Sequence, residues 1–141
     1  MAALALSALA LGGCGESAEQ KATAQVCKAR TDISTQITKL EGLPISTSFL
    51  PEAEKGVEAI RSDLKQIKAA QPNLAPARRE QVAVATQGFE KEMSALAAGL
   101  AAGVKAGVGP EQLAAAAPQV KAGLAQLASA YKQALAPISC S

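Results

Sequence analysis

The sequence predicts an all-α fold, a single antiparallel up-down-up-down four-helix bundle, and three observations lead to it. Apolar residues recur at three- and four-residue steps in every long segment, whereas no stretch shows the two-residue alternation of a strand. Short connections separate four such segments, as between antiparallel neighbours in a bundle. Pro51, Pro76 and Pro110 each stand where a segment opens, a position that proline favours in the first helical turn.

The first predicted helix begins near Ser17, whose hydroxyl can form a capping box with Gln20, and it stops at Gly42. The second runs from Pro51 to Ala70. It is expected to end there because Pro72 disfavours helical geometry at the residue that precedes it. The expected core positions of these two helices are Val26, Ile33, Ile37, Leu40, Val57, Ile60, Leu64 and Ile67.

The third helix is expected from Pro76 to about Ala106, and the fourth from Pro110 to about Ala136 with a kink at Pro118. Their expected core positions are Val82, Phe89, Met93, Leu96, Leu100, Val104, Val120, Leu124, Leu127, Tyr131 and Leu135. The third helix would be roughly 46 Å long and the second roughly 30 Å at 1.5 Å per residue. The long hairpin of helices three and four should therefore overhang the first pair.

The overhang is expected to be poor in charge, since only Lys105 and Glu111 are ionised between Glu92 and Lys121. Three glycines recur there at four-residue steps, Gly99, Gly103 and Gly107. Small faces of this kind let two helix backbones approach closely. The uncharged stretches are too short to span a membrane, so we expect tight packing within a hairpin.

The loop 42–50 contains four apolar residues where a turn would normally be polar, Leu43, Ile45, Phe49 and Leu50. Two interpretations stay open. The side chains could fold over the overhang and seal the core, or they could form an exposed patch that binds a partner. We take these four as the candidate binding residues.

This sequence lacks the residues that several common classes of enzyme and cofactor site require. The absence of histidine removes Ser-His and Cys-His nucleophiles, histidine-ligated haem and the Glu-x-x-His di-iron motif. No glycine-rich phosphate loop follows a strand, and the formal charge of +2 argues against nucleic-acid binding. We therefore expect no catalytic residues, no metal, no cofactor and no nucleic-acid partner.

The tetrad Leu11-Gly12-Gly13-Cys14 directly follows the apolar run Ala2–Leu11. This arrangement resembles the lipobox of bacterial lipoproteins. The resemblance implies removal of residues 1–13 as a signal peptide, lipidation of Cys14 with diacylglycerol, and a membrane anchor at the extracytoplasmic face. The remaining chain would be a polar stalk, 14–25, and a bundle domain, 26–141.

Lipidation of Cys14 would leave Cys27 and Cys140 as the remaining cysteines. Outside the cytoplasm two such thiols are expected to form a disulfide, here closing a loop of 113 residues (140 minus 27). The bundle topology brings their two positions to one end. Two buried free thiols are the alternative.

These observations predict a non-enzymatic cell-envelope lipoprotein, an interaction or scaffold module that presents its membrane-distal tip to another envelope protein. The alternative is a carrier of a lipid or other apolar ligand, with the loop 42–50 as a gate. An exposed flat tip would favour the first function, and an enclosed apolar cavity the second.

Overall fold

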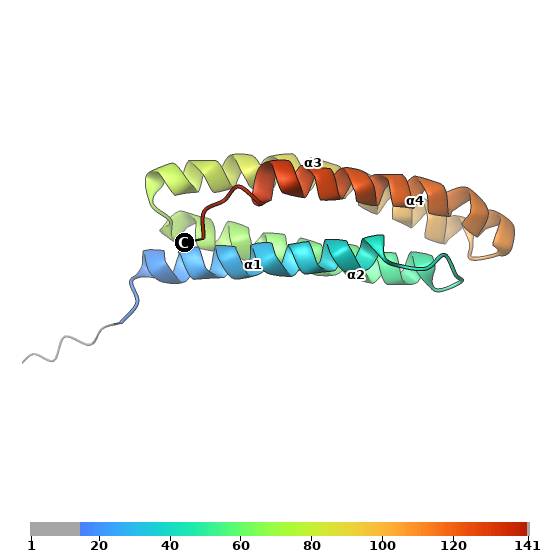
Figure 1. Ribbon diagram of the computed structural model, residues 1–141, viewed down its shortest axis with the longest axis horizontal. Helices are drawn as coiled ribbons and strands as arrows, with labels where there is room; N and C mark the ends of the chain where they lie inside the picture. The colour runs from blue at the N-terminus through green and yellow to red at the C-terminus, as the bar shows by residue number, and fades with distance from the viewer. Residues whose placement is uncertain (1–14, 141) are drawn as a thin grey trace, which may run out of the picture.

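The computed structural model describes residues 15–140, which form a bundle of four long helices (Figure 1). The helices are α1 (Ala18–Glu41), α2 (Phe49–Ala70), α3 (Pro76–Ala106) and α4 (Pro110–Ala130). A short 3-10 turn, η1 (Gln71–Asn73), follows α2, and a π-helical turn, η2 (Tyr131–Leu135), continues α4. No strand occurs in this part of the chain, so the all-α prediction is confirmed.

Contacts between helices show that neighbours run antiparallel. Lys121 in α4 contacts the end of α1 through the carbonyl of Glu41, whereas Tyr131, ten residues later in η2, contacts the earlier Arg30. Likewise Lys68 near the end of α2 pairs with Glu90 in α3, whereas Glu54 near the start of α2 lines a hollow with the later Ala101. The chain therefore runs up, down, up and down, and α1 and α4 lie side by side.

The helix boundaries follow from local chemistry. Ser17 and Gln20 form the expected capping box, with hydrogen bonds of 2.9 and 3.1 Å between each side chain and the other's backbone N–H. Pro76 and Pro110 occupy the first turns of α3 and α4. Gly107 ends α3 with a φ of 111°, a conformation that a residue with a Cβ rarely adopts.

The start of α2 differs from the sequence-based prediction. The helix α2 begins at Phe49 rather than Pro51, because burial of Phe49 and Leu50 draws the end of the loop into its first turn. The first helix begins at Ala18, next to the expected start near Ser17. The segment 14–25 expected as a stalk is therefore helical from Ala18, and Ala22 is buried in the core.

The fourth helix continues through Pro118 without interruption and ends at Ala130, before the expected end near Ala136. Its continuation widens into the π-helical turn, where the N–H of Ala136 donates to the carbonyl of Tyr131 five residues earlier. Leu135 at the end of that turn and Ile138 just after it are both fully buried. The wide turn thus closes the core at the end of the chain.

The core runs the length of the bundle and matches the predicted positions closely. Of those positions, only Val104 and Tyr131 are half-buried rather than buried. The sequence-based prediction omitted Leu74, Leu113 and Ile138, which lie in turns or near helix ends and are also buried. Their burial depends on how the ends of the chain fold back, which helical periodicity does not describe.

Close backbone approach occurs where glycine meets a large side chain. A Cβ added to Gly56 in α2 would lie 2.4 Å from a methyl carbon of Leu40 in α1. One added to Gly123 in α4 would lie 2.9 Å from a methyl carbon of Leu96 in α3. These glycines therefore allow each pair of helices to pack closely.

Figure 1 shows the consequence of the unequal helix lengths. The turn between α3 and α4 projects beyond the loop between α1 and α2. The start of α1 and the end of the described chain lie together at the opposite end of the bundle. The expected overhang is present, and it gives the bundle two different ends.

Candidate functional site

The structure separates the four candidate binding residues of the loop 42–50. Phe49 and Leu50 are 0% exposed, and Leu43 is half-buried against the core. Only Ile45 is open to solvent, with 57% of its surface exposed. Phe49 and Leu50 are therefore corrected from candidate contact residues to core residues, because a helix that starts at Phe49 directs both side chains inward.

Lys121 fixes this loop against the hairpin. Its ammonium group donates hydrogen bonds to the carbonyls of Glu41, at 3.1 Å, and Leu43, at 2.8 Å. The carbonyl of Glu41 belongs to the last residue of α1 and that of Leu43 lies just beyond it, where a helix leaves acceptors unpaired and favours positive charge. The same ammonium lies 5.5 Å from the centroid of the Phe49 ring, within range of a cation–π contact. Lys121 thus ties α1, the loop and α4 together.

An open groove runs along the outer side of the α3–α4 pair. It consists of two hollows of about 380 and 450 Å³ that share Gly99 and Gln119. Glu92 and Glu111 are the charged residues in its lining. The other lining residues are mostly small or amide-bearing: Ala95, Leu96, Ala102, Gly103, Ala106, Gln112, Ala115, Ala116, Val120, Ala122, Gly123 and Gln126.

The three glycines of the overhang have three different roles. An added Cβ on Gly103 would lie 3.3 Å from the Cβ of Ala116, so this residue provides the expected close approach. Gly107 supplies the turn with positive φ. An added Cβ on Gly99 would meet no atom within 4 Å, so Gly99 faces the open groove.

The ion pairs lie elsewhere on the surface. Among residues 15–140 they join Lys28 to Asp32, Arg61 to Glu58, and Lys68 to Glu90, all involving α1 or α2. Such exposed pairs contribute little stability. The outer side of the α3–α4 pair is instead nearly uncharged, and Val108 is 43% exposed at its tip.

Two side chains on the α1–α2 side have shifted pKa values. Partial burial, with a smaller contribution from the nearby Asp32 carboxylate, raises the pKa of Asp63. The hydrogen bond and attraction to Asp32 raise the pKa of Lys28. Both shifts describe local packing and pairing, and neither group lies in the α3–α4 groove.

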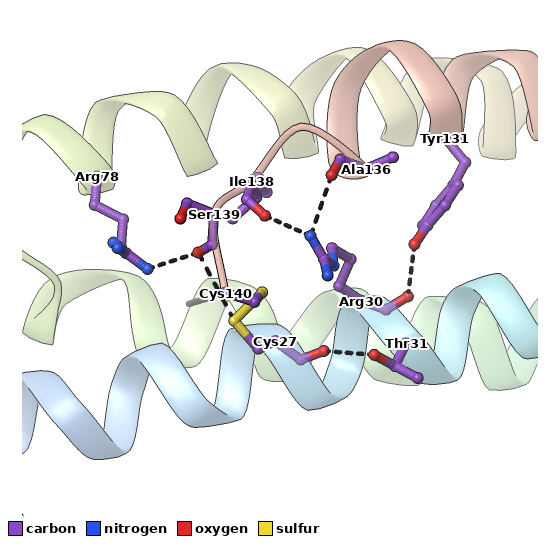
Figure 2. Close-up of a disulfide and its surroundings, with 9 residues drawn as sticks. All are labelled: Cys27, Arg30, Thr31, Arg78, Tyr131, Ala136, Ile138, Ser139 and Cys140. Atoms are coloured by element: carbon purple, nitrogen blue, oxygen red, sulfur yellow. Dashed lines mark hydrogen bonds between the residues drawn. A yellow bond between two sulfur atoms is a disulfide. The ribbon is translucent and has the colours of Figure 1, made fainter.

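The opposite end of the bundle contains the expected disulfide. Cys27 and Cys140 are bonded, with their Cα atoms 5.6 Å apart (Figure 2). Arg30 and Arg78 contact the same C-terminal segment through its backbone carbonyls. The structure therefore supports the pairing, whereas Cys14 lies outside the described residues.

Residues 15–140 were compared with the requirements of a metal site and of a membrane-spanning helix. Within residues 15–140 no group of three His, Cys, Asp or Glu side chains is placed to hold a metal ion. None of the helices in that range is both long and apolar enough to cross a membrane. Comparison of the chain with protein-family models, curated proteins and solved structures gives no match.

Proposed function

We propose that this protein is a lipid-anchored module of the bacterial cell envelope, attached through Cys14, that binds another envelope protein without catalysing a reaction. The lipobox-like tetrad supports the anchor. Three residues, Gly15–Ser17, separate Cys14 from the first helical residue, and they span at most about 10 Å. An acyl anchor on Cys14 would therefore hold the disulfide end near the membrane.

The main support for an interaction function is the nearly uncharged groove on the outer side of α3 and α4. Burying this surface against a partner would desolvate few charges, since Glu92 and Glu111 are the charged residues in its lining. Exposed Val108 adds an apolar residue at the projecting turn. Open apolar surface of this kind is typical of protein interaction sites.

A carrier of an apolar ligand has less support. The two hollows of the α3–α4 pair are open grooves, whereas carriers bury most of the ligand's surface in a cavity. The loop proposed as a gate is held by Lys121 and by the buried side chains of Phe49 and Leu50. Opening it would expose core residues.

The anchor is tested by intact-mass analysis of protein extracted from bacterial membranes. We expect residues 14–141 with added acyl mass, and Cys14→Ser should abolish that mass and the stable association with membranes. Two or more acyl chains give durable anchoring, whereas one chain binds only marginally. A membrane-free protein that retains residues 1–13 would contradict the anchor.

The interaction surface is tested by photo-cross-linking in intact cells. A photoreactive residue at Ala102 or Val108 should capture a discrete protein partner, whereas the same residue at Lys55 on α2 should not. Both Ala102 and Lys55 are exposed and lie within long helices, so they are matched positions. Equal capture from all positions, or none from the groove, would refute the proposed surface.

A further inference from the structure

The C-terminal segment 136–140 forms a strap that folds back from η2 onto α1 and α3 (Figure 2). Ile138 in its middle is 1% exposed and belongs to the core. The disulfide to Cys27 is its only covalent attachment to the bundle apart from the chain itself. Two arginines from α1 and α3 also donate side-chain hydrogen bonds to its backbone carbonyls.

Arg30 makes the principal polar contacts with the strap. Its terminal nitrogen donates hydrogen bonds to the carbonyls of Ala136, at 3.1 Å, and Ile138. The Nε atom of Arg30 is buried and has no partner. Arg30 is half-buried, and within the described chain its guanidinium donates only to the strap. The accepting carbonyls lie beyond the last helical turn, where no helical N–H is available to them.

Two further hydrogen bonds extend this arrangement. Arg78 in α3 donates to the carbonyl of Ser139 at 2.8 Å, directly before Cys140. The hydroxyl of Tyr131 donates to the carbonyl of Arg30 at 3.2 Å, which ties η2 to the same turn of α1. Together with the buried side chain of Ile138, these contacts surround the disulfide (Figure 2).

We propose that Arg30 and Arg78 dock the strap without the disulfide and so deliver Cys140 to Cys27 for oxidation. The disulfide then locks a segment that is already in place. Without docking, the two thiols would meet through a flexible end at a low effective concentration. Arg30 and Arg78 are positioning residues in this scheme, and they do not take part in the exchange chemistry.

The oxidation step itself is thiol–disulfide exchange. Glutathione disulfide accepts the electrons: one protein thiolate attacks it and releases one glutathione thiol, and a mixed disulfide forms. The second protein thiolate then attacks that mixed disulfide, which forms the Cys27–Cys140 bond and releases the second glutathione thiol. The protons of the two protein thiols pass to solvent and then to the two glutathione thiolates that leave. The strap contacts act on this second step.

The test measures the equilibrium constant for Cys27–Cys140 formation in glutathione buffers. The full chain is used with Cys14→Ser, so that no third thiol exchanges, and circular dichroism checks that both redox states are folded. Arg30→Gln should lower the constant about 100-fold or more, since it removes two charge-assisted hydrogen bonds that each contribute about 10-fold or more. Arg78→Gln should lower it about 10-fold or more, since that residue makes one such bond to the strap.

Two controls separate docking from general stability. Arg61→Gln removes a surface arginine paired with Glu58 and should leave the constant unchanged. Leu113→Ala destabilises the bundle at its far end and should also leave the constant unchanged while the protein remains folded. A similar fall in either control would overturn the positioning role, because the effect would then follow stability alone.

Hydrogen exchange of the reduced chain gives an independent readout. The amides of the strap should be protected in the reduced wild-type chain and lose that protection in Arg30→Gln. If Arg30→Gln does not fold, Arg30→Lys keeps the charge with a single donor group and should show an intermediate loss. An unprotected strap in the reduced wild-type chain, or an equilibrium constant within twofold of wild type in the arginine variants, would refute the proposal.

Discussion

Replacing Phe49 by alanine should strongly destabilise the protein, because Phe49 seals the core beneath the loop 42–50. Its side chain is 0% exposed at the first turn of α2. Truncation of a buried phenylalanine costs about 3–5 kcal/mol in unfolding free energy through lost transfer energy and the cavity left behind. About 0.5–2 kcal/mol of this would be the contact with the ammonium of Lys121.

The assay is urea unfolding followed by circular dichroism, with the disulfide intact. In a thermal melt followed by the same signal, a loss of this size would lower the melting temperature by about 10–20 °C for a domain of this length. Ile45→Ala is the matched control, since Ile45 lies in the same loop but is 57% exposed. It should change the unfolding free energy by less than about 0.5 kcal/mol.

A double-mutant cycle with Lys121→Met isolates the contribution of the contact between the ammonium and the ring. Phe49→Ala should be less damaging in that background. If Phe49→Ala stays within about 1 kcal/mol of wild type with an unchanged dependence on urea, Phe49 is not a core seal. A variant that folds normally but loses its cross-linked partner would restore the contact role instead.

Three further predictions use the same unfolding assay. Removal of the disulfide through Cys27→Ser and Cys140→Ser should cost roughly 4–5 kcal/mol, the chain-entropy value for a loop of this length; an unchanged midpoint would contradict it. Gly56→Ala should destabilise by about 1–3 kcal/mol through overpacking against α1, whereas Gly99→Ala, whose Cβ meets open space, should stabilise by about 0.5–1 kcal/mol. The raised pKa of Asp63 means that the folded state binds its proton more tightly than the unfolded state, so the contribution of Asp63 to stability should fall as pH rises from the ordinary carboxyl range through the raised pKa. Asp63→Asn should remove that part of the pH dependence and should not reduce stability at neutral pH; an unaltered pH profile would count against the shift.

Local chemistry was sufficient to predict the four helices and most of the core. The capping box at Ser17, the proline at the start of α3 and the glycine at its end each act within a few residues. The apolar stripe of each helix likewise depends only on the 3.6-residue repeat. The side chains that the repeat places inward, such as Ile33 and Phe89, are fully buried.

The loop 42–50 illustrates what periodicity leaves open. Its apolar composition was compatible with a binding patch or a core seal. The choice depends on whether the neighbouring hairpin covers it, and Lys121, 71 residues beyond Leu50 (121 minus 50), supplies the contacts that hold it down. Such a contact between distant segments leaves no trace in the local pattern.

The sequence by itself determined the fold class, the helix order and the low charge of the α3–α4 hairpin. It could not assign the glycines, because Gly99 and Gly103 both follow two alanines and precede an aliphatic residue. Gly99 nevertheless faces the open groove, whereas Gly103 packs against the neighbouring helix. Only the tertiary structure decided this, along with the docking of the C-terminal strap by Arg30. Helix periodicity fixes which side chains share a face, whereas the relative placement of helices fixes what each face meets.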